Sequence, residues 1–244
     1  MSAVVLETQR LLLRAWRDED LEPWYRMNAD PRVMEFFPRT WDRERADGVA
    51  TRIRAMLDAQ GYGWWVVEVK NRAPFAGVIQ LQDVPFTEHF TPATEVGWRF
   101  ACEYWGNGYA TEGAAAALDF GFATLGLREI VAMTAVSNLR SRRVMERLGM
   151  QRDVNGDFDH PRIEPGHPLR RHVLYRKTAS DARTCVNVTI ASCSELPHTN
   201  TVPPFPTSKR SAGRGRTPAG RYPWAQRTTR AANGKVRCRQ CTAL

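Results

Sequence analysis

The spacing of hydrophobic residues changes partway along this 244-residue chain, and the change limits the folds it can adopt. Three short runs rich in β-branched and aromatic residues, at 63–70, 75–82 and 94–101, are typical of strands, and the first two predict an antiparallel hairpin. Apolar or small residues then recur every three or four positions, as on one side of a helix. Residues 129–136 form a nearly continuous apolar run, as expected for a strand covered on both faces. This order predicts an α/β (α+β) domain with a mixed, mostly antiparallel sheet flanked by helices.

The remaining residues up to 178 contain further helical and strand patterns. Further helices are expected at about 19–28, 41–60 and 138–148, and further strands at 10–17, 150–154 and 172–177. Residues 33–38 are apolar but broken by Pro38, which favours a packed loop. The polar, proline-containing stretch 155–171 is expected to be a loop.

The net charge of +9 belongs to the C-terminal part of the chain. Residues 179–244 hold eleven of the 35 lysines and arginines but only two of the 26 acidic residues, so the preceding part carries no net charge. Rich in Thr, Ser, Arg, Gly and Pro, this tail has no hydrophobic periodicity and cannot bury enough apolar surface to offset its ordering entropy. We expect a folded domain over 1–178 and a disordered basic tail over 179–244.

The chain has no pattern of a secreted or membrane protein. Its N-terminus lacks the basic start and apolar stretch of a signal peptide. No apolar run approaches the roughly 18 residues that span a bilayer. Five cysteines, an odd number, argue against a disulfide scaffold. We therefore expect a cytoplasmic protein that does not contact membranes.

One glycine-containing stretch points to chemistry. Trp105-Gly-Asn-Gly-Tyr-Ala-Thr-Glu112 follows a strand and opens a helix. Two glycines let a ligand approach the backbone, and the unpaired N–H groups of a helix start attract a pyrophosphate. A dinucleotide-binding turn fits less well, because Thr111 stands where the third glycine belongs. The absence of Gly-Lys-Ser/Thr excludes a P-loop. A glycine turn without any ligand stays open at this point.

A second stretch lies one strand later and supports a more specific interpretation. It begins with Asn138-x-x-Ser141 and ends with Glu146-Arg-Leu-Gly-Met150. With Glu95-Val-Gly-Trp98 and the glycine stretch before it, in matching order and spacing, residues 7–177 resemble the GNAT family of acetyl-CoA-dependent N-acetyltransferases. The likeness is strongest to the branch that acetylates ribosomal-protein N-termini (RimJ/RimL-like). Trp105 departs from the Arg or Gln of the broader family pattern.

The resemblance implies a splayed sheet whose fourth and fifth predicted strands, 94–101 and 129–136, part to admit acetyl-CoA. Backbone groups at the end of the fourth strand would pair with the pantetheine arm as an added strand does. The amides of the glycine turn would bind the pyrophosphate, and Asn138 would bind the pantetheine amide. The implied cofactor-binding residues are Phe100, Cys102, Gly106, Asn107, Gly108, Tyr109, Ala110, Thr111, Asn138 and Ser141.

Two residues are expected to move protons. Ser141 would protonate the leaving thiolate. The acceptor amine must lose a proton, and Glu95 is the preferred general base, with Glu68 and Asp83 as alternatives. Because orienting two substrates can supply much of the rate, no base is strictly required.

The acceptor groove is expected to include Phe36 and Phe37, which match the positions that line it in the resembled fold. His160 and His167 stand in the polar loop without paired ligand spacing, and Cys238-x-x-Cys241 is a single pair. No metal is therefore expected, and His160 is expected to be a solvated loop residue.

The sequence thus predicts acetyl transfer from acetyl-CoA to a primary amine. A protein N-terminal amine is the first candidate, and a small-molecule amine such as a polyamine or an aminoglycoside is the second. RNA or ribosome binding through the basic tail is an alternative of another class, because basic residues interspersed with glycine suit non-specific phosphate contact. A tail without any function is a further alternative, and both a monomer and a homodimer are compatible with the chain.

Overall fold

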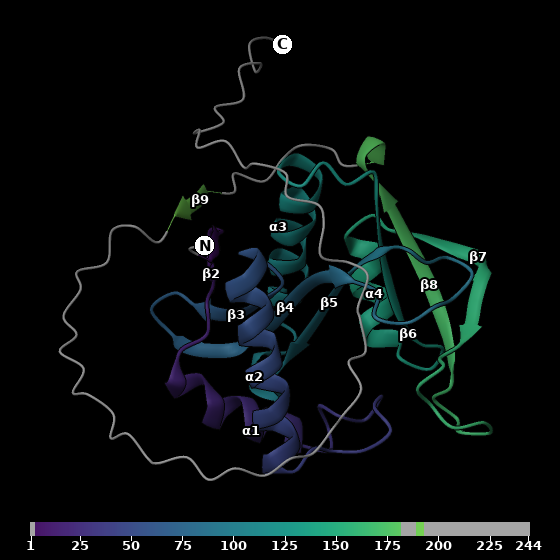
Figure 1. Cartoon of the computed structure of the whole chain (residues 1–244), viewed down its shortest axis with the longest axis horizontal. Coiled ribbons are helices and arrows are strands. Elements are labelled where there is room, and N and C mark those ends of the chain that lie inside the picture. Colours follow the sequence, from purple (N-terminus) through teal and green to yellow (C-terminus); the bar gives the residue numbers. More distant parts are fainter. Residues whose placement is uncertain (1–2, 182–188, 193–244) are drawn as a thin grey trace, which may run out of the picture. The chain divides into compact units, whose positions relative to one another are not determined.

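The computed structural model describes residues 3–181 and 189–192. These residues form one nine-stranded sheet in the order β7-β8-β6-β5-β4-β3-β2-β1-β9, flanked by four α-helices (Figure 1). Neighbouring strands are antiparallel except β5 and β6, which are parallel. The expected mixed, mostly antiparallel sheet is confirmed. The strands are β1 (Val4–Glu7), β2 (Leu11–Arg14), β3 (Trp64–Val69), β4 (Ala73–Asp83), β5 (Thr94–Phe100), β6 (Glu129–Ala135), β7 (Gln151–Asp159), β8 (Arg171–Thr178) and β9 (Thr189–Ser192), and the helices are α1 (Leu21–Ala29), α2 (Arg43–Gln60), α3 (Tyr109–Ala123) and α4 (Leu139–Arg147).

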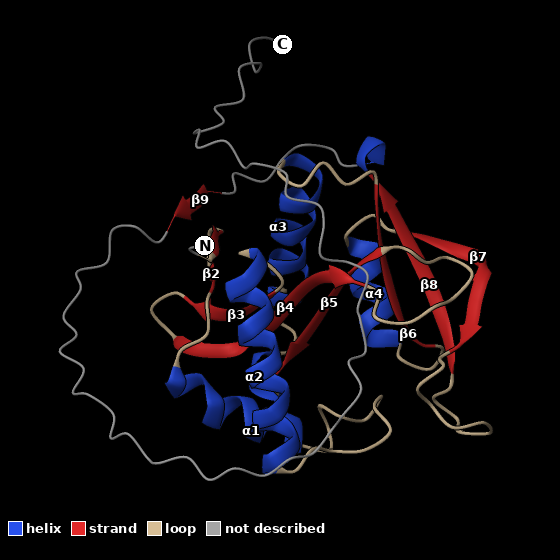
Figure 2. Cartoon of the chain, in the orientation of Figure 1, coloured by secondary structure: helices blue, strands red, loops and turns tan. Residues whose placement is uncertain are grey.

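Helices pack on both faces of the sheet (Figure 2). Successive side chains of a strand point to opposite faces, so each strand contributes to two apolar clusters. On β4, Ile79 and Leu81 pack with α3 in one cluster, whereas Val78 packs with α1 and α2 in the other. The largest side chain of the second cluster, Trp24 of α1, is fully buried. The two faces of the sheet therefore pack against different helices, α3 on one side and α1 and α2 on the other.

The sheet is splayed between β5 and β6. These two parallel strands are in register at one residue pair only, Glu95 with Val131. On its other side β5 pairs with β4 over its whole length, and β6 does the same with β8. Both strands are thus held by their outer neighbours while they separate from each other. The result is a wedge with its apex at Glu95 and its open end beyond Phe100 and Ala135, where the sequence predicts that the fourth and fifth strands part.

Three strand segments differ from the sequence prediction. Strand β1 was not expected, and it pairs with β2 and β9. The polar residues 155–159 belong to β7 instead of a loop, because Phe158 and Asp159 pair with the start of β8. Strand β9 stands within the stretch 179–244 and pairs with β1, which the sequence did not predict. The rest of the tail, apart from a short turn at 179–181, lies outside the described residues, and so does its expected contact with RNA.

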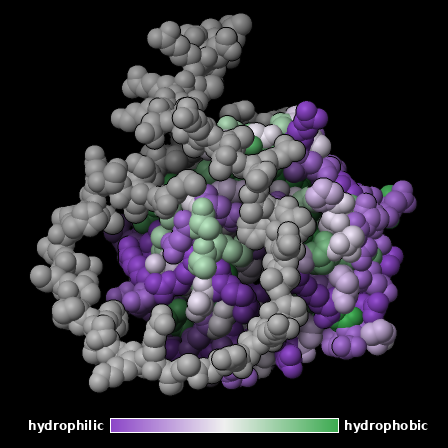
Figure 3. All heavy atoms as spheres, in the orientation of Figure 1, coloured by the Kyte–Doolittle hydropathy of each residue, from purple (hydrophilic) through white to green (hydrophobic). Residues whose placement is uncertain are grey.

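The surface of the described residues is mostly hydrophilic in the view of Figure 3, with apolar side chains scattered over it. Over residues 3–181 and 189–192, no helix has the length and apolar character needed to cross a membrane. Two of the exposed large apolar side chains, Val136 and Leu139, lie where β6 leads into α4. They therefore stand at the open end of the wedge.

Candidate active site

The glycine turn before α3 carries unpaired backbone donors. Gly106 and Gly108 have φ angles of 77° and 79°, in the left-handed region that glycine adopts without strain. A Cβ at Gly106 would meet no atom within 4 Å, so the space beside the turn is open. The N–H groups from Gly106 to Thr111 find no acceptor among the described residues. This group of donors at a helix N-terminus suits an anion, as the sequence predicts.

Arg10 fixes the turn from a distant part of the chain. Its guanidinium donates to the carbonyl of Asn107 (3.0 Å) and to the carboxylate of Glu112 (2.6 Å). The hydroxyl of Thr8 also donates to Glu112, at 2.6 Å. Burial on its own would raise the pKa of Glu112, but the hydrogen bonds from Thr8 and Arg10 hold that pKa below its ordinary value. Glu112 therefore stays ionised and joins the start of α3 to the loop between β1 and β2.

A second arginine lies beside the first turn of α3. Arg72 donates to the hydroxyl of Tyr109 (3.2 Å), and the Cζ of Arg10 lies 4.9 Å from the centre of the same ring. Sequence reasoning did not find either arginine as a site residue, because 97 residues separate Arg10 from Asn107 and no local pattern connects them. Arg72 adds positive charge next to the anion-binding donors, whereas the charge of Arg10 is paired with that of Glu112.

The edge of β5 that faces the wedge presents main-chain groups. The N–H of Ala101 donates to Ala76 (3.0 Å), so by strand alternation the N–H and C=O of Phe100 point away from β4, toward the wedge. Trp105 occupies part of this edge. Its indole N–H donates to the carbonyl of Phe100 (2.8 Å), and its main-chain N–H donates to the carbonyl of Cys102 (3.1 Å). A ligand at this edge would share both carbonyls with Trp105.

The Cys102 thiol stands just past this edge of the sheet. Its Sγ lies 3.8 Å from the carboxylate of Asp30. Burial and the neighbouring Asp30 raise the pKa of this thiol, so it is protonated at neutral pH. A thiol in that state is a poor nucleophile, which agrees with a role in packing.

Asn138 and Ser141 meet at the start of α4, on the opposite wall of the wedge. The Asn138 side chain accepts from the Ser141 N–H (3.1 Å), which caps the helix. Its amide donates to Thr134 (2.9 Å) and to the Ser141 hydroxyl (3.1 Å). Because the Ser141 oxygen accepts here, its own hydrogen is free to be donated. The two residues lie together as expected, and Asn138 is held by capping bonds in this structure.

Glu95 stands at the apex of the wedge with two amide partners. Its Oε1 accepts from Gln80 and from Gln82, each at 2.9 Å. The indole of Trp64 in turn donates to the Gln82 carbonyl (2.7 Å), which fixes the orientation of that amide. Burial raises the pKa of Glu95, while the bond from Gln82 and the charge of Arg162 act in the opposite direction. A carboxylate with a raised pKa can accept a proton near neutral pH.

The other two candidate bases have different surroundings. Glu68 accepts from Arg14 at 2.9 Å and lies 3.7 Å from Arg17, so it forms ion pairs with two cations. Asp83 accepts from the Thr94 hydroxyl (3.0 Å) at the exposed end of β4. Of the three carboxylates, Glu95 alone stands where β5 and β6 separate.

Phe36 and Phe37 lie in the segment between α1 and α2, and each lies beneath an arginine. The Cζ of Arg99 is 4.2 Å from the centre of the Phe37 ring, and that of Arg140 is 5.4 Å from the Phe36 ring. Arg140, on α4, also pairs with Glu35. The α1–α2 segment thus reaches the helix that follows β6, and it borders the open end of the wedge.

His160, one of two histidines in the predicted polar loop, is partly buried. Its ring lies 4.9 Å from the centres of both Phe86 and His172, and burial lowers the pKa of His160 to about 4. Its exposure is therefore less than that of a fully solvated loop residue, because it packs against a distant loop. In the described part of the chain, no three His, Cys, Asp or Glu residues gather as a metal site would require.

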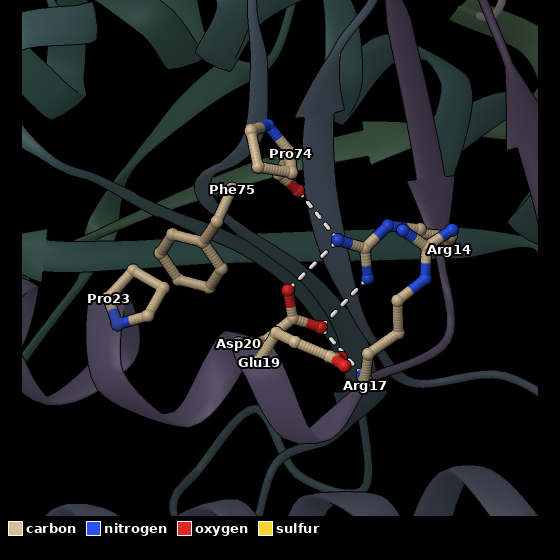
Figure 4. A pocket seen from close by; sticks show the side chains of 7 residues that line it. All are labelled: Arg14, Arg17, Glu19, Asp20, Pro23, Pro74 and Phe75. Atoms are coloured by element: carbon tan, nitrogen blue, oxygen red, sulfur yellow. Dashed lines mark hydrogen bonds and ion pairs between the residues drawn. The ribbon is translucent and has the colours of Figure 1, made fainter.

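A pocket at the start of α1 involves none of the predicted site residues (Figure 4). Arg14 directs its guanidinium at Asp20 with bonds of 2.8 and 2.9 Å, at Glu68 (2.9 Å) and at the carbonyl of Pro74 (2.6 Å). Every nitrogen of that guanidinium has a partner, so the group joins β2, α1, β3 and β4. The lining residues are Arg14, Arg17, Glu19, Asp20, Pro23, Pro74 and Phe75.

Comparison with known proteins identifies the family. The model of the acetyltransferase (GNAT) domain matches residues 10–151. The chain is 34% identical over 152 residues to an FsC-acetyl coenzyme A-N(2)-transacetylase of Aspergillus fumigatus, covering 59% of this chain and 64% of that relative. A GNAT-family acetyltransferase from Bacillus anthracis superposes with a TM-score of 0.60 at 27% identity, over 72% of this chain and 99% of the other. The chain belongs to the GNAT family, the acetyl-CoA-dependent N-acetyltransferases.

One further structure is similar in fold. RimJ of Mycobacterium smegmatis, solved in complex with CoA-disulfide, superposes with a TM-score of 0.58 over 75% of this chain and 90% of that protein. Its sequence identity of 21% shows a common fold alone.

Proposed function

We propose that this chain transfers an acetyl group from acetyl-CoA to a primary amine, with the protein N-terminal amine as first candidate acceptor. The observation that carries the proposal is the wedge between β5 and β6, which has unpaired N–H donors near its open end and Glu95 at its apex. An anionic cofactor with a long arm fits such a site, since the anion and the reacting end lie at opposite ends of one opening.

The cofactor would be held by contacts along the wedge. The N–H groups from Gly106 to Thr111 would receive the pyrophosphate, with Arg10 holding the turn in place and Arg72 adding positive charge. The main-chain groups of Phe100 would pair with the pantetheine arm, sharing the carbonyl with Trp105. The Asn138 amide would give up its hydrogen bond to Thr134 or Ser141 and donate to the pantetheine arm instead. The exposed side chains of Val136 and Leu139 offer the pantetheine arm apolar contact.

Two residues of this chain would handle the protons. Acetyl-CoA supplies the acetyl group as a thioester. Glu95 would accept the proton that the attacking amine loses as its nitrogen bonds to the carbonyl carbon. Ser141 would donate its hydrogen to the thiolate released when the carbon–sulfur bond breaks. Water would then return a proton to Ser141 and take one from Glu95, which restores both residues. The Gln80 and Gln82 amides keep the Glu95 carboxylate oriented for this task.

A small-molecule amine is the second candidate acceptor. It is favoured by the name of the Aspergillus relative, an N(2)-transacetylase, although the chain covers only 64% of that protein. The RimJ/RimL-like branch is proposed from the sequence motifs. A cytoplasmic location, a monomer or homodimer and contact of the tail with RNA stay predictions.

The test is an acceptor panel with a free-thiol readout. Acetyl-CoA would be mixed with the full chain and with peptides differing in their first residues, polyamines or aminoglycosides. We expect thiol release with peptides above the rate without acceptor, and acetylation of the N-terminal nitrogen by mass spectrometry. We also expect acetyl-CoA to raise the melting temperature and NADH to leave it unchanged, because a ligand that binds only the native state stabilises it. A shift with NADH and none with acetyl-CoA would overturn the proposal.

A further inference from the structure

Arg99 of β5 is enclosed by aromatic rings on the α1 and α2 face of the sheet. The Cζ of its guanidinium lies 4.2 Å from the ring centre of Phe37, 4.9 Å from Trp41 and 5.7 Å from Trp24. Its Nη1 donates to the side-chain oxygen of Asn28, which is fully buried. Rings hold the flat faces of the cation, so its remaining N–H groups define where a partner can bind.

The guanidinium has no anionic partner among the described residues. Its Nε is buried and donates to no acceptor there. The nearest acid to Asn28 in sequence is Asp30, and that carboxylate is bound by Arg32, which with other contacts brings the pKa of Asp30 to about 2. Burial lowers the pKa of Arg99 to about 9, which leaves it charged at neutral pH. A cation removed from water without a counter-ion is costly, and stacking on aromatic rings offsets only part of that cost.

Arg99 and Glu95 share one face of β5. Residues 95, 97 and 99 alternate to the same side, and their span is about 13 Å at the usual rise of a strand. Between them stands Gly97, which has no side chain, and a Cβ there would lie 2.6 Å from the Gln80 amide. The strand therefore presents the Glu95 carboxylate, a glycine covered by the Gln80 amide and the Arg99 guanidinium in a row.

We propose that Arg99 binds a carboxylate of the acceptor and selects amines that carry one. This inference rests on the proposed function and specifies its substrate class: a primary amine with a carboxylate several bonds away. The amine would lie at Glu95 and the carboxylate at Arg99, where the free donors of the guanidinium form charge-assisted hydrogen bonds. An N-terminal peptide with an acidic residue near its start has this chemistry, and so does a small amino acid. Polyamines and aminoglycosides carry no carboxylate, and the Arg99 cation repels their positive charges.

The test compares acceptors that differ only in that charge. Two peptides with the same N-terminal residue would carry Glu or Gln at the second position. A linear amino acid with a terminal amine would be compared with its carboxamide, which separates a peptide source of the carboxylate from a small-molecule source. We expect kcat/KM to be about ten- to a hundredfold higher for the charged member of the preferred pair, mostly through KM. Equal values within both pairs would overturn the inference.

Variants then assign the preference to Arg99. Arg99→Gln should remove it, and Arg99→Lys, which keeps the charge without the planar donors, should retain part of it. The matched control is Arg45→Gln. Arg45 is exposed and its Cζ lies 5.4 Å from the centre of the same Trp41 ring, so this variant removes an equal charge from the surface and should keep the preference. A preference that survives in Arg99→Gln overturns the inference. A thermal shift with acetyl-CoA confirms that each variant is folded.

Binding measurements distinguish this inference from the proposed function. Calorimetry would titrate the Glu and Gln peptides into wild type and Arg99→Gln in the presence of CoA. Tighter binding of the Glu peptide to wild type alone supports the site even when no acceptor is acetylated, in which case only the proposed function fails. Acetylation of all amines at equal rates, with equal binding, supports the function and overturns the carboxylate site.

Discussion

Two arginines on the same face of the sheet have opposite surroundings. Arg14 of β2 is buried, and its guanidinium donates to Asp20 and to the Pro74 carbonyl (Figure 4). It also donates to Glu68 and to the Ala15 carbonyl. Arg99 of β5 is surrounded by aromatic rings, and the bond to Asn28 is its one side-chain hydrogen bond among the described residues. Both cations are removed from most of the solvent, but among the residues that the structure describes only the first has its charge neutralised.

The difference separates a structural group from a binding group. A guanidinium whose donors are all bonded internally can offer nothing to a ligand, and its removal leaves other charges without a partner. A guanidinium with free donors can bind a ligand, and its removal leaves no orphaned carboxylate. The same distinction applies to the main chain, where the N–H groups from Gly106 to Thr111 have no acceptor among the described residues and are available to a ligand.

The largest expected effect tests this distinction through stability. Arg14→Leu should lower the free energy of unfolding by about 3–5 kcal/mol, because Asp20 would stay buried without its cation. Arg99→Met should cost less, about 1–2 kcal/mol, because it removes the contacts with aromatic rings and leaves the buried Asn28 oxygen without this donor, while no carboxylate loses a partner. Urea unfolding followed by tryptophan fluorescence gives both values. Equal losses in the free energy of unfolding would mean that Arg99 stabilises the fold as much as Arg14 does, which would contradict the distinction between the two arginines.

The next largest effect is expected on catalysis, from the Glu95 carboxylate at the apex of the wedge between β5 and β6. Glu95→Gln should lower kcat/KM by about a hundredfold, the usual contribution of a general base. Burial raises the pKa of Glu95, and a base acts only when deprotonated, so wild-type kcat/KM should rise as pH increases through that raised value. The variant should lack this rise. Asp83→Asn, at the other candidate base, is the control and should keep the wild-type pH profile. A rise that persists in Glu95→Gln would leave substrate positioning as the main source of rate.

The fold was largely predictable because its main elements have local patterns. Helices α2 and α3 follow apolar periodicity, and β6 is a buried run with the expected burial. Strands β1 and β9 are four residues each, too short to show a pattern, and they form by pairing with distant partners. The end of β7 is polar because it lies at the margin of the sheet, so its sequence resembles that of a loop.

The candidate site was predictable in part for the same reason. The glycine turn and the Asn138–Ser141 cap are contiguous stretches, and both lie where the sequence indicates. Arg10 and Arg99 have no such pattern. Their roles depend on partners 102 and 71 positions away, Glu112 and Asn28, and only the folded chain brings these together.

A smaller effect is expected from the glycine turn, where it tests the free main-chain donors. Gly108→Val should weaken CoA binding about tenfold or more in calorimetry, because its φ of 79° strains any side chain and the added group stands beside the anion donors. The control is Gly166→Val, which introduces comparable strain at a φ of 82° in the loop before β8. It should lower stability by a similar amount while leaving CoA affinity unchanged. Equal affinity in both variants would show that the turn does not hold the phosphates.

The smallest effect concerns a carboxylate that lacks a partner but does not lie at the wedge. One oxygen of Asp119, on α3, is buried without a hydrogen bond among the described residues, and burial raises its pKa to about 6 despite the charge of Lys177. The native state therefore binds a proton that the unfolded chain, with an ordinary pKa near 3.8, has released. Stability should fall as pH rises from about 4 to 6, and the full penalty should be present above 6.

Asp119→Asn removes this penalty and separates an unpaired group from a functional one. At pH 7 the variant should be more stable than wild type by about 1 kcal/mol, a value reduced for screening by water at this partly exposed carboxylate. At pH 4 the two proteins should have the same melting temperature, because wild-type Asp119 is then protonated. Acetyl transfer should be unchanged at either pH. If Asp119→Asn is more stable but has a reduced kcat/KM, an unpaired buried group away from β5 also contributes to the site. Unpaired donors and acceptors alone would then not distinguish binding regions from structural ones.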